Sequence, residues 1–301
     1  MNWDPTQFFR DDHTPNPFAL IILNQPINER AFRVLQKHAK VTLCADGGAN
    51  CFYSMMKSHD RESTDLPDLI IGDLDSITPA TKCHYADLGV PIIQDDDQYS
   101  TDFTKCLNYL RAHVGDFIPS APSTSVSNTE GVEKNEGGGP DLDVLILGGL
   151  GGRVDQAFSQ IHHLYSMTQS YSASASGAGD STANPGGTKR IGNLYLVSEE
   201  SITFILRPGL NTIQTPGANR PDIPARGQGE DLLEENVGII PLLGPARITT
   251  SGLRWDVVDW KTEIGGQLST SNHIRSEVVT VESAVPVLFT VELAGRLKRA
   301  R

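Results

Sequence analysis

The chain has 301 residues, and its 25 Lys and Arg against 37 Asp and Glu give a formal net charge of −12. This acidic balance argues against a protein that follows the phosphates of a nucleic acid or binds an anionic membrane surface. The sequence shows neither an apolar run of the roughly 20 residues that span a bilayer nor an amino-terminal signal peptide. Its four cysteines lack CxxC spacing. We therefore expect a cytoplasmic protein with no nucleic-acid or membrane partner.

The first half of the chain alternates short apolar runs with helical segments. Continuous apolar runs suit strands that are buried on both faces, and five occur, at residues 18–23, 41–44, 69–71, 91–93 and 144–147. Four segments are typical of helices, at residues 28–38, 78–88, 101–114 and 153–166. This alternation predicts an α/β domain with a mostly parallel, doubly wound sheet.

The second half changes to short strands separated by Gly, Pro and Asn turns. Regularly spaced short strands without a convincing helix predict an all-β sandwich, here at residues 194–197, 202–206, 237–242, 246–250, 277–282 and 285–293. We therefore expect two domains, an α/β domain over residues 1–180 and a β-sandwich domain over residues 191–301.

Three segments are too polar to build a hydrophobic core. Residues 119–140, 168–190 and 214–236 are rich in Ser, Gly, Pro, Asn and Glu. Such a composition buries too little apolar surface to offset the entropy lost on ordering. We predict that these segments are flexible inserts.

Acidic or Gly-rich sequences follow four of the predicted parallel strands. Asp46-Gly47-Gly48 follows the second strand, Gly72-Asp73-Leu74-Asp75 follows the third, residues 95–102 follow the fourth, and residues 148–155 follow the fifth. The carboxyl ends of parallel strands meet at one edge of the sheet, and in open α/β sheets ligands bind at that edge. The sequence therefore predicts a ligand site built from carboxylates and glycines.

Carboxylates at one edge repel each other, by about 4 kcal/mol for two charges 4 Å apart at an effective dielectric of 20. A proton or a cation must neutralise them, and oxygen ligands without His or Cys favour Mg²⁺ or Mn²⁺ over zinc. Gly-rich turns let backbone N–H groups reach phosphate oxygens, and Arg153 offers a bidentate clamp. Together these features favour magnesium-dependent phosphate chemistry.

Simpler or different interpretations stay open at this point. Asx turns also explain why acidic residues follow the predicted strands. The glycine-rich segment 148–155 does not match the dinucleotide-binding pattern GxGxxG, because Val154 stands at its third glycine position. The sequence contains no GxxxxGK[ST], which excludes a P-loop. Residues 69–77 also resemble the DxD motif of haloacid-dehalogenase phosphatases, with Asp73 as nucleophile and Asp75 as acid–base. A non-catalytic magnesium–nucleotide sensor is a further alternative.

Six segments, in the expected order, resemble thiamine pyrophosphokinases: CADGGAN (44–50), LIIGDLDSI (69–77), QYSTDFTKCL (98–107), LGGLGGRVDQ (147–156), SGLRWDV (251–257) and STSNHI (269–274). The long inserts are similar to those of fungal members. The resemblance implies an ATP- and magnesium-binding α/β domain, a thiamine-binding sandwich and a homodimer whose active site is shared between subunits. It also implies transfer of pyrophosphate from ATP, the co-substrate, to the hydroxyl of thiamine, which gives thiamine diphosphate and AMP.

The resemblance also implies residue roles. It assigns catalysis to Asp73, Asp75, Asp102, Arg153 and Asp155, and the metal to Asp46, Asp73, Asp75 and Asp102. It assigns ATP to Asp46, Gly47, Gly48, Gly72, Gln98, Thr101, Gly149, Gly151 and Arg153. It assigns thiamine to Trp255, Ser269, Thr270, Ser271 and Asn272.

Some of these roles stay open. Tyr99 stands where many relatives carry a second Asp, so the number of metal ligands in that motif is undetermined. The sequence does not determine which carboxylate, if any, accepts the alcohol proton; Asp73 and Asp102 are the candidates. From the residues alone, Trp255 is also compatible with the sandwich core, and residues 269–272 with an ordinary hairpin turn.

Overall fold

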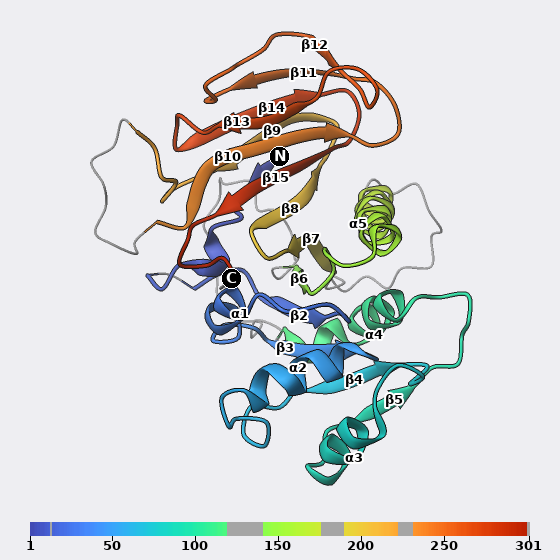
Figure 1. The fold of residues 1–301 in the computed structure, drawn as a ribbon. Helices are drawn as coiled ribbons and strands as arrows, with labels where there is room; N and C mark the ends of the chain where they lie inside the picture. Colours follow the sequence, from blue (N-terminus) through green and yellow to red (C-terminus); the bar gives the residue numbers. More distant parts are fainter. Residues whose placement is uncertain (13, 119–140, 176–189, 222–230, 300–301) are drawn as a thin grey trace, which may run out of the picture.

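The computed structural model describes residues 1–12, 14–118, 141–175, 190–221 and 231–299. The predicted insert at 119–140 therefore lies outside the described residues. The described strands form a ten-stranded sheet in the order β13-β10-β15-β8-β7-β6-β2-β3-β4-β5, and a five-stranded sheet in the order β1-β9-β14-β11-β12. In Figure 1 the large sheet extends from β13 in the upper part of the molecule to β5 at the bottom.

The α/β half contains the predicted parallel sheet. Its pairs β6-β2, β2-β3, β3-β4 and β4-β5 are all parallel, and its strands are β2 (Phe18–Ile22), β3 (Val41–Ala45), β4 (Leu69–Gly72), β5 (Ile92–Gln94) and β6 (Leu142–Leu147). Every residue of β2, β3, β4 and β6 is buried. Burial of both faces explains why these strands are continuously apolar.

Helices cover both faces of this sheet. One hydrophobic core joins it to α1 (Glu29–Leu35), α2 (Gly48–Lys57) and α3 (Pro79–Asp87), and a second core joins the other face to α4 (Asp102–Phe117) and α5 (Val154–Ala175). Oxygens of Asn28, Thr78 and Thr101 each accept a backbone N–H in the first turn of α1, α3 and α4, which satisfies a group that the helix leaves unpaired. The predicted apolar stripe of α4 is buried: Phe103, Cys106, Leu107, Leu110 and Val114.

The β half forms the predicted sandwich, but it shares the large sheet. β7 (Ile191–Val197) pairs in parallel with β6, and the strands beyond it pair antiparallel: β8 (Ser201–Leu206), β15 (Val287–Leu293), β10 (Leu233–Pro241) and β13 (Ser269–His273). The second layer consists of β1 (Asn2–Trp3), β9 (Gly209–Gln214), β14 (Val278–Ser283), β11 (Ala246–Ser251) and β12 (Trp260–Thr262). The large sheet therefore crosses the predicted domain boundary without a break.

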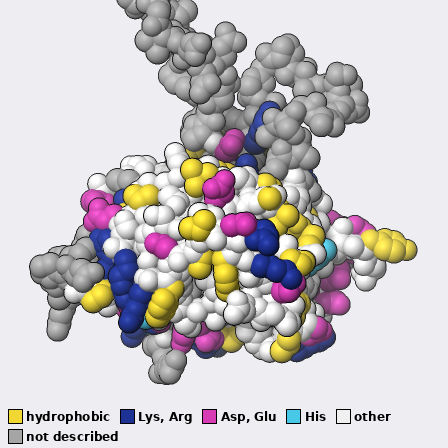
Figure 2. Space-filling view, turned by 90° about the horizontal axis from the view of Figure 1, so that it is seen from above, with side chains coloured by type: hydrophobic (Ala, Val, Ile, Leu, Met, Phe, Trp, Pro, Cys, Tyr) yellow, Lys and Arg dark blue, Asp and Glu magenta, His cyan; other side chains and the backbone are white. Residues whose placement is uncertain are grey.

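The core of the sandwich is continuous with the core under α1, α2 and α3. Phe204 and Phe289 of the large sheet and Ile213 and Val281 of the small sheet belong to the same buried cluster as Phe32 of α1. Strands β11 and β14 alternate buried and more exposed residues, as expected where one face meets solvent. Figure 2 shows the β12 end of the molecule, where hydrophobic side chains are scattered among polar and charged ones.

Two of the predicted inserts are shorter than expected. Helix α5 continues to Ala175, so the first part of the segment 168–190 is helical. Within 214–236, the residues on either side of the undescribed residues 222–230 pack inward. Ala218, Leu232 and Leu233 are buried. The polar composition of each segment as a whole concealed these short buried ends.

Six elements of the described residues were not predicted: β1, a short 3-10 helix (Gln7–Phe9), α2, β9, β12 and β13. Among the described residues, no helix combines the length and the apolar character that crossing a membrane requires.

The fold contains one buried carboxyl group whose ionisation affects stability. Asp143 in β6 is 3% exposed, and its Oδ1 accepts the backbone N–H of Asn193 at 2.7 Å. Burial raises the pKa of Asp143 to about 7; the bond from Asn193 opposes this rise, and the carboxyl of Asp141 adds to it. The folded protein therefore keeps this carboxyl neutral in a pH range where the unfolded chain ionises it.

We expect the wild-type protein to lose stability as the pH rises from about 4 to about 7, because the unfolded chain releases the Asp143 proton at lower pH. Between pH 5 and pH 8 this loss should amount to about 2–3 kcal/mol, and Asp143→Asn should remove it. Urea unfolding at both pH values measures the difference. Asp87→Asn, at an exposed position in α3, serves as the control. An Asp143→Asn variant with the wild-type pH dependence would contradict this account.

Candidate active site

Three carboxylates meet at the carboxyl edge of the parallel sheet. Asp46 directly follows β3, Asp73 directly follows β4, and Asp102 is the first residue of α4. Each offers one oxygen, and these three oxygens lie within 4.8 Å of one another. The predicted convergence of acids from separate strands is therefore present for these three residues. We refer to them as the carboxylate cluster.

Asp46 is held in place by backbone amides. Its Oδ2 accepts the N–H of Ser76 at 2.9 Å, and its Oδ1 accepts the N–H of Ile77 at 3.0 Å. Burial raises the pKa of Asp46, the two amide bonds oppose the rise, and the charges of Asp102 and Asp73 add to it. Because each of its oxygens accepts a backbone N–H, the Asp46 carboxylate has a fixed orientation within the carboxylate cluster.

Gly72 allows the carboxylates to approach each other. A Cβ at this position would lie 2.5 Å from the Cβ of Asp46 and 3.1 Å from Oδ1 of Asp102. The first distance is far below van der Waals contact, so a larger residue would push Asp46 away. Gly72, which the resemblance assigned to ATP, acts here as a spacer between two members of the carboxylate cluster.

Lys105 is a buried cation beside the carboxylate cluster, and sequence reasoning missed it. It lies one turn along α4 from Asp102, is buried, and places Nζ 3.3 Å from Oδ1 of Asp102. Burial raises the pKa of Asp102, and Lys105 opposes the rise. The apolar stripe gave no signal, because Lys105 lies on the other side of α4 from Phe103, Leu107 and Leu110; the only local hint was its spacing of three residues from Asp102, which suits an ion pair.

Asp75 lies outside the three-residue group. It is exposed, its carboxylate accepts the hydroxyl of Ser76 at 2.8 Å, and its backbone N–H donates to Asp73 at 3.3 Å. Leu74 between the two acids has a positive φ of 66°. Asp75 therefore borders the carboxylate cluster without joining it.

The loop before α4 is largely exposed. Gln98 is exposed and Tyr99 is fully exposed. Asp97 accepts the hydroxyl of Ser100 and the N–H of Tyr99, and these bonds lower its pKa. Thr101 caps α4, and its hydroxyl lies 3.3 Å from Nε2 of His163. The Thr101 side chain thus has a structural partner on each side.

Glycines shape the two turns nearest the switch point of the sheet, where β2 has β6 on one side and β3 on the other. Gly148 has a φ of 71°, and a Cβ there would lie 2.7 Å from the carbonyl oxygens of Leu23 and Gln25. A Cβ at Gly47 would lie 2.3 Å from the side chain of Asn24. Gly148 is therefore required, because it combines a positive φ with backbone contacts, whereas a side chain at position 47 would displace the side chain of Asn24. Two further assigned glycines, Gly149 and Gly151, lie in the 148–152 turn, and Gly48 begins α2.

Arg153 and Asp155 stand at the exposed end of this glycine run. Nε of Arg153 donates to Oδ1 of Asp155 at 3.1 Å, and both side chains are mostly exposed. The structure therefore pairs these two predicted residues with each other, outside the carboxylate cluster.

The predicted thiamine residues gather at the edge strand β13. Trp255 is 52% exposed, so it is not a core residue. The backbone N–H of Trp255 donates to Oδ1 of the buried Asn272 at 3.1 Å, and Nδ2 of Asn272 donates to the backbone carbonyl of Trp255 at 3.0 Å. The guanidinium of Arg254 lies 4.7 Å from the indole ring. Ser269, Thr270 and Ser271 belong to the same strand rather than to a hairpin turn.

β13, whose Asn272 is hydrogen-bonded to Trp255, lies in the opposite half of the large sheet from β3 and β4, which Asp46 and Asp73 follow (Figure 1). Seven strand-to-strand steps separate β13 from β3 in the strand order. At about 4.8 Å per step this is roughly 30 Å along the sheet. The two groups of predicted residues therefore do not face one another within one chain.

Known proteins match this chain over nearly its whole length. The family described as "Thiamin pyrophosphokinase, catalytic domain" matches residues 32–174, and "Thiamin pyrophosphokinase, vitamin B1 binding domain" matches residues 223–288. Thiamine pyrophosphokinase 1 of Arabidopsis thaliana is 30% identical, with 93% of this chain and 88% of the relative covered. The Saccharomyces cerevisiae thiamine pyrophosphokinase is 28% identical, with 91% and 85% covered.

The fold also matches a solved structure. Thiamin pyrophosphokinase from Candida albicans aligns with a TM-score of 0.73 at 27% identity, over 97% of this chain and 92% of that chain. The first matched family segment contains the carboxylate cluster, and the second contains Trp255 and Asn272. The chain belongs to the thiamine pyrophosphokinase family.

Proposed function

We propose that this protein transfers the pyrophosphoryl group of ATP to the hydroxyl of thiamine. The observation that carries the proposal is the carboxylate cluster at the carboxyl edge of a parallel sheet, in a chain of this family. The thiamine hydroxyl oxygen forms a bond to the β-phosphorus, and the bond between that phosphorus and the oxygen bridging to the α-phosphate breaks. AMP leaves with that oxygen, and the hydroxyl proton passes to a carboxylate or to water.

The donor set of the carboxylate cluster fits Mg²⁺ or Mn²⁺. Three carboxylate oxygens within 4.8 Å of one another are hard ligands, with one buried ammonium beside them. Asp46, Asp73 and Asp102 would hold the cation, which neutralises charge on the triphosphate. Because both Asp46 oxygens accept amide N–H groups, Asp73 and Asp102 remain the candidates for the proton acceptor.

The other residues at this edge would position the nucleotide. The turn at 148–152 offers backbone N–H groups to phosphate oxygens, and Arg153 would exchange its partner Asp155 for a phosphate. Asp75 borders the same site through its bond to Asp73, and the exposed Gln98 lies in the loop that leads to Asp102. Catalysis would then come mostly from positioning and charge stabilisation.

Thiamine would bind at Trp255 and β13 of a second subunit. The exposed indole ring suits stacking on a cationic thiazolium, and β13 offers hydroxyl groups. A homodimer with a shared active site would bring these groups to the carboxylate cluster, which lies roughly 30 Å away along the sheet of one chain. Near the glycine run, Phe158 is 66% exposed on α5, as expected for a surface that a second copy covers.

The four cysteines are free, in agreement with the cytoplasmic location that we propose. The direct test of the function is incubation with Mg-ATP and thiamine. Thiamine diphosphate and AMP should form in equal amounts. Phosphate release without thiamine would favour a phosphatase with Asp73 as nucleophile, and ATP binding without turnover would favour a sensor.

Replacing Asp73 tests the carboxylate cluster. Asp73→Asn keeps the size of the side chain but removes a charge from the cluster, so we expect kcat to fall by more than about 10²-fold, the loss typical of a group that stabilises transition-state charge. Asp96→Asn, in the exposed loop before α4, should retain near wild-type kcat. Circular dichroism should show both variants folded. An Asp73→Asn variant with normal turnover would refute the assignment.

Mixing two defective variants tests the shared active site. Trp255→Ala should raise KM for thiamine more than KM for ATP, and at low thiamine it should be nearly inactive. Unfolding and refolding it together with Asp73→Asn should restore about a quarter of wild-type activity, because half of the randomly formed dimers have one intact site of two. If each site lies within one chain, mixing restores nothing.

A further inference from the structure

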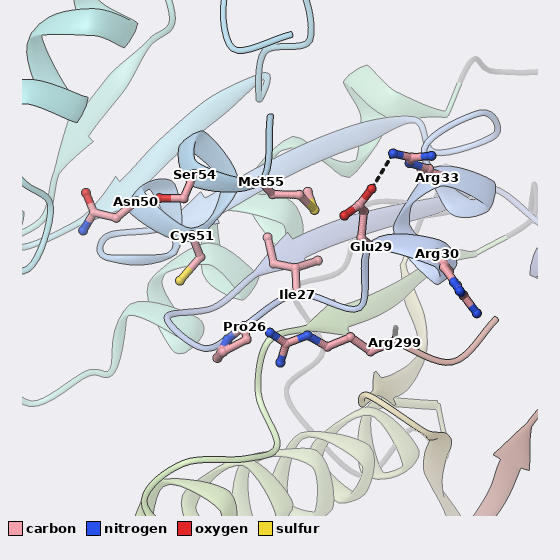
Figure 3. A pocket seen from close by; sticks show the side chains of 10 residues that line it. All are labelled: Pro26, Ile27, Glu29, Arg30, Arg33, Asn50, Cys51, Ser54, Met55 and Arg299. Atoms are coloured by element: carbon pink, nitrogen blue, oxygen red, sulfur yellow. Dashed lines mark ion pairs between the residues drawn. The ribbon is translucent and has the colours of Figure 1, made fainter. Parts of the chain in front are cut away.

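A cavity of about 640 Å³ lies beside the carboxylate cluster and has the opposite charge. It opens between α1, α2 and the carboxyl-terminal segment (Figure 3). Three guanidinium groups line it, from Arg30, Arg33 and Arg299. Neither the resemblance nor the proposed function assigns a role to this cavity, which we call the arginine pocket.

The arginine pocket keeps an excess of positive charge after its internal pairs are counted. Arg33 pairs with Glu29, Arg299 pairs with Glu199, and Arg30 donates to the carbonyl oxygen of Gly295 at 3.1 Å. Three guanidiniums thus face two carboxylates, in a chain with a net charge of −12. Each guanidinium has five N–H donors in a planar fork that matches phosphate oxygens. The pocket is therefore suited to an anion that the rest of the surface repels.

The middle of the arginine pocket is apolar. Ile27 and Met55 lie between the guanidiniums of α1 on one side and Asn50 and Ser54 of α2 on the other (Figure 3). Such a lining accommodates an aromatic or aliphatic body as well as an anionic group. The volume lies within the range of roughly 300–1,000 Å³ usual for small-molecule sites. An inorganic anion alone would leave this apolar surface uncovered.

The arginine pocket is next to the carboxylate cluster but separate from it. Asn50 lines the pocket, while its side chain donates to the Ser76 carbonyl at 2.9 Å and accepts the N–H of Thr78 at 3.0 Å. The same turn holds Asp46 through the N–H of Ser76. The first turn of α2 therefore stands between the two sites.

We infer that the arginine pocket binds an organic diphosphate through its guanidiniums and without a metal ion. Two sources share this chemistry, a nucleoside diphosphate and thiamine diphosphate. The choice of thiamine diphosphate as a probe rests on the proposed function, whereas ADP as a probe does not. Phosphate binding at the carboxylate cluster requires a cation, because three carboxylates repel an anion, so a chelator separates the two sites.

The test is equilibrium dialysis of the full-length chain in EDTA against ADP, thiamine diphosphate and inorganic pyrophosphate in turn. At least one of the two organic probes should bind with one equivalent per chain. Arg30→Gln combined with Arg299→Gln should weaken that binding at least tenfold, through lost charge-assisted hydrogen bonds. Arg247→Gln, an exposed arginine paired with Asp259 on β11, should bind as the wild type does.

A second variant covers the case in which the double arginine variant does not fold. Ser54→Glu adds a carboxylate to the pocket from an exposed helix position and should also weaken binding at least tenfold, while the uncharged Ser54→Gln should not. Asp73→Asn should bind the probe normally, so the result does not depend on turnover. The inference fails if neither organic probe binds in EDTA, if the charge variants bind normally, or if pyrophosphate binds as tightly as the organic probes.

Discussion

The repulsion among Asp46, Asp73 and Asp102 is the constraint on which the site depends. Each pair of charges 4.8 Å apart costs about 3–4 kcal/mol at an effective dielectric of 20. The fold opposes this repulsion with the two amides on Asp46 and the ammonium of Lys105 on Asp102. These groups do not balance three carboxylates. The structure is therefore built to accept further positive charge at this edge, which is the property that a magnesium–nucleotide site needs.

Much of the fold followed from hydrophobic patterning. The parallel strands β2, β3, β4 and β6 lie within two residues of their predicted bounds, because burial on both faces leaves a continuous apolar run. Two of the missed elements show why the remainder was harder to predict. β13 is a polar edge strand in which only Asn272 is fully buried, so Ser269–Asn272 was equally compatible with a turn. α2 has buried apolar residues at helical spacing, Ala49, Phe52 and Met56, but it starts with Gly47, its N-cap, and Gly48, which are typical of a loop. Close packing against Asn24 and the Ile22 carbonyl explains both glycines.

The sequence also predicted the position of some site residues better than that of others. Strand topology brings Asp46, Asp73 and Asp102 together, and topology was readable from the sequence. Side-chain direction was not readable. Asp75 belongs to the same short motif as Asp73, but it follows a residue with positive φ and lies outside the group. The role of Gly72 as a spacer depends on contacts with Asp46 and Asp102, which are far from it in sequence. Lys105 pairs with Asp102 within α4, but its burial depends on what packs around the helix, which no local motif encodes.

The continuous sheet also limits how the two halves can cooperate. A hinge between them would have to break the parallel pairing of β6 with β7 and divide a hydrophobic core that includes both Phe32 and Phe289. Closure within one chain is therefore costly. The two-fold dimer that we propose needs no such change, because each copy would present its Trp255 edge to the carboxylate cluster of the other copy. We expect the rigid sheet to fix the distance between the two half-sites, so that the geometry of the dimer, rather than domain motion, sets how thiamine meets the nucleotide.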